Sequence, residues 1–63
     1  MNTMIENYIN GNLATAKKQA KRFSFIQIIE ALREEYGYSH AKAEATAAYL
    51  KNCGLFQAAC DAI

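Results

Sequence analysis

Residues able to carry out nucleophilic or acid–base chemistry are few in this chain. Its 63 residues include one histidine, His40, one aspartate, and two cysteines, Cys53 and Cys60. Hydrolysis or group transfer needs a nucleophile, a base and an orienting group that converge on a water-excluding pocket. No basic residue lies next to Cys60 in the sequence, so nothing in the sequence favours a reactive thiolate there. Glu34 and Glu35 are adjacent and therefore point apart on a helix, so they do not form a carboxylate pair for acid–base chemistry. We therefore predict that the protein is not an enzyme.

The same residues make a poor set of metal ligands. Cys53 and Cys60 are seven positions apart, which is not the Cys-x-x-Cys spacing of a zinc site. With His40 as the only histidine, a four-ligand site would need carboxylates to complete it. We read the cysteines as reduced, buried thiols, because disulfide-stapled small proteins normally contain four or more. No metal and no cofactor is predicted.

Basic residues are concentrated near the beginning of the chain. Residues 1–22 carry four basic side chains against Glu6, a net charge of +3, whereas residues 23–63 carry three basic and five acidic side chains, a net charge of −2. The four basic residues fall within about 140° of one predicted helix, opposite its apolar strip. They are Lys17, Lys18, Lys21 and Arg22. Three interpretations stay open for this patch, namely a solvated face, a contact for an acidic protein surface, or a contact for nucleic acid.

A helix predicted over residues 40–52 carries small residues on two sides. Ala43, Ala47 and Leu50 lie nearly opposite a second group that comprises Ala41, Ala45 and Ala48. One hypothesis is that this helix runs through the middle of a bundle and packs against neighbours on both sides. The other is that one face, with Ala43 and Ala47, is open and docks onto a partner or a second copy.

Tyrosines supply the remaining candidate contacts. Their rings are apolar and their hydroxyl groups tolerate a wet boundary, so tyrosines often anchor interfaces. From their positions we expect Tyr36 and Tyr49 in the core and Tyr8 and Tyr38 in a partner-binding surface.

The local signals that position these residues are helical throughout. Ser24 and Gln27 form a capping box ahead of an apolar face, and Gly37 ends that helix with a left-handed residue. No alternating strand pattern occurs. We predict an all-α bundle of four to five short helices within a single domain, 1–63. The expected helices cover about 3–10, 13–23, 25–36, 40–52 and 55–62.

The composition makes the predicted core thin. Twelve residues are alanine, and the chain has no valine, tryptophan or proline. A chain this short buries only about 60% of its unfolded surface, so a partner or a second copy would add stability. The first residues include an acid and no apolar run of signal-peptide or membrane-spanning length follows. We expect a cytoplasmic protein that does not bind a membrane.

Residues 20–24 and 49–62 resemble, in style and size, small orphan proteins encoded by bacterial phages and plasmids. The resemblance includes no diagnostic motif, and no functional residue is transferred from it. It implies a stand-alone protein that acts by binding, for example by blocking a host defence or transcription complex.

Three functions follow from the sequence. The first is a non-catalytic protein-binding module, an inhibitor or adaptor that uses the basic residues, the two tyrosines and the alanine face. The second is a small DNA-binding regulator in which residues 25–36 and 40–52 form a helix-turn-helix, although the second helix lacks the usual base-reading side chains. The third is an obligate homodimer.

Overall fold

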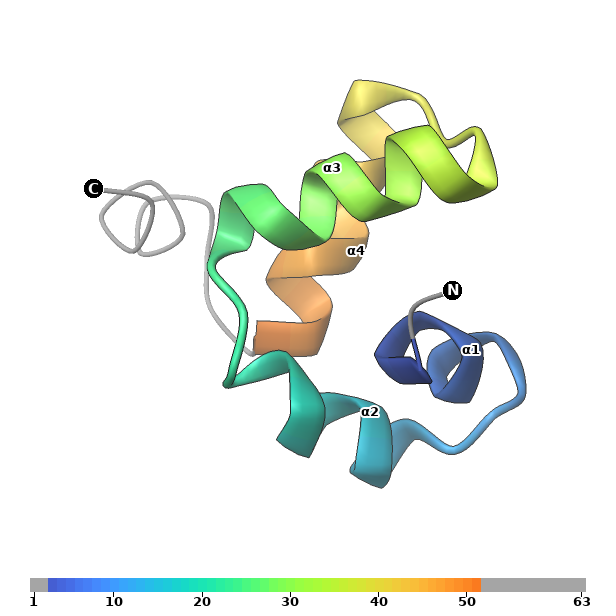
Figure 1. Ribbon diagram of the computed structural model, residues 1–63, viewed down its shortest axis with the longest axis vertical. Coiled ribbons are helices and arrows are strands. Elements are labelled where there is room, and N and C mark those ends of the chain that lie inside the picture. The colour runs from blue at the N-terminus through green and yellow to red at the C-terminus, as the bar shows by residue number, and fades with distance from the viewer. Residues whose placement is uncertain (1–2, 52–63) are drawn as a thin grey trace.

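A computed structural model describes residues 3–51 of the chain. These residues form four α-helices and no strand, which confirms the all-α bundle (Figure 1). The helices are α1 (Thr3–Ile9), α2 (Leu13–Ala20), α3 (Phe25–Tyr36) and α4 (His40–Lys51). The predicted helix over residues 55–62 and residue 52 lie outside the described part of the chain. Within that part, no helix has the length and apolar character needed to cross a membrane.

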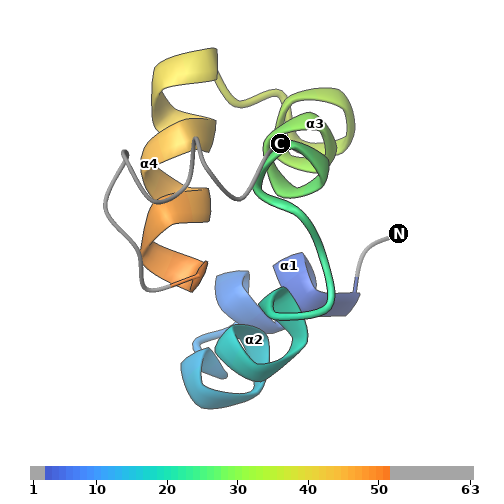
Figure 2. The same ribbon diagram turned by 90° about the vertical axis from the view of Figure 1, so that its left-hand side faces the viewer.

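The four helices are arranged as two helical hairpins. α1 packs against α2, α3 packs against α4, and the two hairpins are joined by contacts between α2 and α4. Two views at right angles show the α3–α4 hairpin on one side of the α1–α2 hairpin (Figures 1 and 2). α1 and α3 contact each other less closely than any of these three pairs.

The ends of α3 follow the local rules read from the sequence. The Ser24 hydroxyl accepts a hydrogen bond from the Gln27 backbone N–H (3.2 Å), and the Gln27 side chain accepts one from the Ser24 N–H (2.9 Å). At the other end Gly37 adopts φ 69°, in the left-handed region. Ser39 caps α4 in turn, since its hydroxyl accepts from the Lys42 N–H at 3.3 Å. These caps satisfy backbone groups that the helices leave without partners.

The second helix is shorter than predicted, because it ends at Ala20 rather than at residue 23. After Ala20 the backbone tightens, with i to i−3 hydrogen bonds from Lys21 to Lys18 and from Phe23 to Ala20. The Phe23 carbonyl oxygen then accepts a hydrogen bond of 2.6 Å from the Lys51 ammonium group at the end of α4. The turn that separates the two hairpins is thus held by the last residue of α4.

Ala43 and Ala47 lie in the core, which corrects the expectation that they form an open face. Both are fully buried on α4, together with Thr46 and Leu50, in an arc about 100° wide. Their small side chains allow the backbones of α3 and α2 to approach α4 through this one arc. The other core residues are Met4, Ile5, Ala16, Ala20, Phe25, Ile28, Ile29 and Leu32.

The opposite group of alanines faces solvent. Ala41 and Ala45 are exposed, and Ala48 is half-buried at the margin of the core. Helix α4 therefore contacts two neighbouring helices, as the first hypothesis states, but through one buried face rather than two.

The burial of Ala47 gives a matched test. We predict that Ala47→Leu lowers the free energy of unfolding by about 1–3 kcal/mol, because added methyl groups in a packed core force neighbours apart. Ala45→Leu, on the exposed side of the same helix, changes it by less than about 0.5 kcal/mol. Urea denaturation followed by circular dichroism measures both, and equal stabilities of the two variants would contradict this packing.

Candidate functional site

The single histidine of the chain lies beside one carboxylate on a helix surface. His40 and Glu44 lie one turn apart on α4, with Nε2 3.8 Å from the carboxylate oxygen and the His40 side chain 60% exposed. A histidine–glutamate pair on a helix surface contributes a few tenths of a kcal/mol when the imidazole is protonated. Among residues 3–51 no group of three or more His, Cys, Asp or Glu side chains could hold a metal ion. Cys53 and Cys60 lie outside this range.

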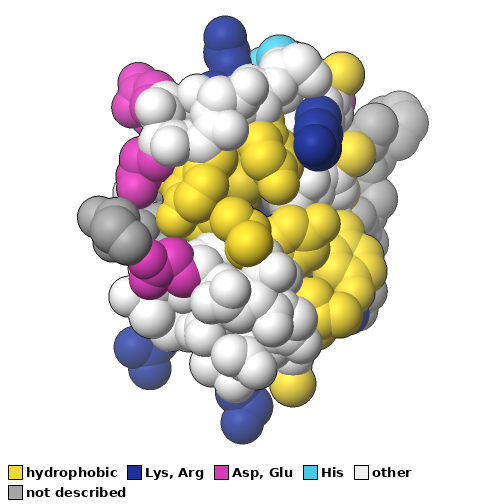
Figure 3. Space-filling model, turned by 90° about the vertical axis from the view of Figure 1, so that its right-hand side faces the viewer, with side chains coloured by type: hydrophobic (Ala, Val, Ile, Leu, Met, Phe, Trp, Pro, Cys, Tyr) yellow, Lys and Arg dark blue, Asp and Glu magenta, His cyan; other side chains and the backbone are white. Residues whose placement is uncertain are grey.

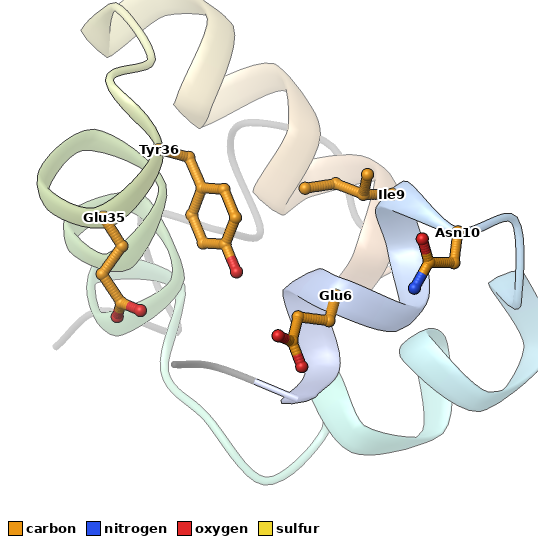
Figure 4. Close-up of a pocket in the computed structure, with 5 residues that line it drawn as sticks. All are labelled: Glu6, Ile9, Asn10, Glu35 and Tyr36. Atoms are coloured by element: carbon orange, nitrogen blue, oxygen red, sulfur yellow. The ribbon is translucent and has the colours of Figure 1, made fainter.

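A cleft of about 610 Å³ opens between α1 and the end of α3. It is lined by Glu6, Ile9, Asn10, Glu35 and Tyr36. In Figure 4, Ile9 of α1 and the ring of Tyr36 of α3 extend toward one another across it, while Glu6 and Glu35 flank it from the two helices. This cleft combines apolar walls with an acidic rim.

A second cleft of about 540 Å³ adjoins the first and shares Ile9 with it. The other residues of its lining are Tyr8, Leu13, Tyr38 and Tyr49. The rings of Tyr8 and Tyr49 are 6.3 Å apart between centroids and tilted by 60°, which is a favourable aromatic arrangement.

Two lysines lie against the rings of the second cleft. The Lys17 ammonium group lies 4.4 Å from the centroid of the Tyr49 ring, and that of Lys42 lies 4.4 Å from the centroid of Tyr38. A cation over an aromatic face at an exposed site contributes about 0.5–1 kcal/mol. The second cleft therefore has a basic rim.

Together the two clefts form one surface, which we name the aromatic groove. It consists of Tyr8, Ile9, Leu13, Tyr36, Tyr38 and Tyr49. Figure 3 shows hydrophobic side chains in a band over the middle of this face, with acidic side chains along one edge and a basic side chain beside the other. Side chains from both hairpins line the groove, because it runs between them.

The groove contains three of the eight predicted contact residues. Tyr8 and Tyr38 are half-buried in its lining, and Lys17 lies on its rim. Lys18 is exposed on α2 and lines neither cleft. Lys21 and Arg22 are exposed in the turn beyond Ala20, so the four basic residues do not share one helix as expected. Ala43 and Ala47 are buried and lie outside any surface.

Four groove residues were missed from the sequence, namely Ile9, Leu13, Tyr36 and Tyr49. Ile9 is 53% exposed, Tyr49 46% and Leu13 39%. The expectation that Tyr36 and Tyr49 lie in the core is wrong for Tyr49, and Tyr36 is half-buried at the margin of the core. For Ile9 and Leu13, position in the chain could have indicated their exposure, since both flank the Gly11 turn that ends α1. Residues next to a turn have neighbours on fewer sides.

Comparisons with protein families, with curated proteins and with solved structures find no match to this chain.

The acidic rim of the first cleft has a measurable electrostatic consequence. Partial burial raises the pKa of the Tyr36 phenol above its ordinary value of 10.0, and the negative charges of Glu6 and Glu35 raise it further. The folded-state pKa exceeds the unfolded one, so the phenol's contribution to stability is present below pH 10.0 and is lost as the pH rises through the folded pKa.

We predict that Glu6→Gln lowers the pKa of Tyr36 toward 10.0, because one of the carboxylates that oppose tyrosinate formation is removed. The ¹³Cζ resonance of Tyr36, followed by NMR as the pH rises, measures it. Glu34→Gln is the control and leaves the value unchanged. An unchanged titration in Glu6→Gln would show that Glu6 does not face the phenol.

Proposed function

We propose that the protein is a non-catalytic protein-binding module, an inhibitor or adaptor that acts by docking a partner onto the aromatic groove. One observation carries the proposal. Large apolar side chains from α1, α2 and α4 are exposed next to one another along the groove, with Ile9 more than half exposed at its centre. A contiguous exposed apolar surface on so small a domain is typical of an interaction site.

The energetics of such a surface favour a protein partner. Apolar area contributes about 25 cal/mol per Å² when it is removed from water. Tyrosines add contact area at low entropic cost and can hydrogen-bond at the edge of an interface. The partner that fits brings apolar side chains to Ile9, a basic side chain to the Glu6 end and an acidic side chain to the Lys17 end.

The lysines near the groove favour protein over nucleic acid. The ammonium groups of Lys17 and Lys42 lie against tyrosine rings, and that of Lys51 donates to the Phe23 carbonyl. Glu6 and Glu35 occupy the other end of the same surface, where they repel phosphates. A backbone-tracking nucleic-acid site instead needs a continuous basic stripe.

A selection of displayed random peptides tests the proposal. The wild-type protein is immobilised at low density so that each groove is free, and bound sequences are recovered and compared with those recovered on Ile9→Ser. We expect peptides with apolar anchors whose retention falls at least about tenfold on Ile9→Ser, because the centre of the contact is truncated.

Ile26→Ser is the matched control. Ile26 is 45% exposed, similar to Ile9, but lines neither cleft, so peptides selected on the wild type keep their retention on this variant. Recovery of no peptide that distinguishes Ile9→Ser from the wild type would overturn the proposed function.

A further inference from the structure

The charges on the rim of the aromatic groove are arranged about its centre. Ile9 is shared by the two clefts. On one side of it the rim is acidic, with Glu6 and Glu35, and on the other side it is basic, with Lys17 and Lys42. The two clefts are also similar in size, at about 610 and 540 Å³.

A half-turn about an axis near Ile9 exchanges these two ends. In two copies of the chain brought groove to groove, the acidic end of each copy then faces the basic end of the other. A two-fold contact uses the same patch on both subunits and therefore requires self-complementarity of this kind. A surface with charges of one sign would repel its own copy.

We propose that the aromatic groove is covered by a second copy of this chain, in an antiparallel two-fold dimer centred on Ile9. Glu6 of each copy faces Lys42 of the other, and the exposed Ile9 side chain of each copy enters a cleft of its partner. The proposal rests on the proposed function of the groove as a protein-docking surface and names an occupant for it.

The contact is expected to be reversible. A stable interface of standard size buries about 800 Å² on each partner, and a contact centred on one small groove of a domain this short is expected to be of the weak, reversible class. Because dimer formation covers Ile9, a foreign protein that uses the groove competes with the second copy. Self-association then sets the concentration of free docking surface.

Sedimentation equilibrium of the wild-type chain from about 1 to about 500 µM measures the dimer directly. We expect the mean mass to rise from monomer toward dimer across this range. Ile9→Ser weakens the association at least about tenfold, whereas Ile26→Ser leaves it within about twofold of the wild type.

A charge exchange tests the antiparallel arrangement. Glu6→Lys places a positive charge against Lys42 of the other copy, and Lys42→Glu places a negative charge against its Glu6, so each variant alone is monomeric. In an equimolar mixture of the two variants, the introduced lysine of one copy faces the introduced glutamate of the other, and the unchanged Glu6 and Lys42 face each other at the opposite end. The mixture therefore recovers a dimer, which weakens as salt is added. Lys18, unlike Lys42 and Lys17, lies over no ring of the groove and lines neither cleft, so Lys18→Glu is the control and dimerises as the wild type does.

Failure of this inference is separable from failure of the proposed function. A wild-type chain that stays monomeric to about 500 µM, or single charge variants that dimerise as the wild type does, would overturn the two-fold dimer. The peptide selection on isolated grooves is independent of both results. If peptides still discriminate against Ile9→Ser, the groove docks other proteins and the second copy is not its occupant.

Discussion

The close approach of α4 to two neighbouring helices is the constraint on which the rest of the structure depends. α4 contacts both α3 and α2, and its buried arc carries Ala43 and Ala47 at the positions where larger side chains would hold these helices apart. Because the chain has few large aliphatic residues, its core depends on close contact between helices rather than on large side chains. The two hairpins are held together on this side of the molecule.

The groove lies where the two hairpins are in less close contact. The hairpins meet through α2 and α4 and are bridged less closely between α1 and α3, where side chains line a gap instead of filling it. The tyrosines suit this boundary because each has an apolar ring and a polar end. The aromatic surface thus lies where the hairpins are bridged least, and the ammonium groups of Lys42 and Lys17 lie over the rings of Tyr38 and Tyr49.

Local rules placed α3 correctly but extended α2 by three residues, and they did not predict which side chains are exposed. The Ser24 capping box and the Gly37 ending depend on residues within one turn of each other, so the sequence alone locates α3 to the residue. Whether Ala43 or Ala41 lies on the buried side of α4 depends on which helices pack against it. The spacing of small residues in the sequence is the same on both faces, so it does not decide between them. The exposure of Ile9 is likewise a tertiary property, because within the seven residues of α1 Met4 and Ile5 are buried whereas Ile9 is exposed. The groove joins residues from all four helices, so no spacing in the chain could reveal it.

The hydrogen bond from the Lys51 ammonium group to the Phe23 carbonyl joins positions 28 residues apart and secures the turn between the hairpins. During synthesis the α1–α2 hairpin leaves the ribosome first, and its partner residue at position 51 follows only after α3 and α4 have emerged. Each hairpin can form from local contacts as it appears, but the angle between them is set last. The groove is therefore completed only after both hairpins have been synthesised, because its lining comes from both.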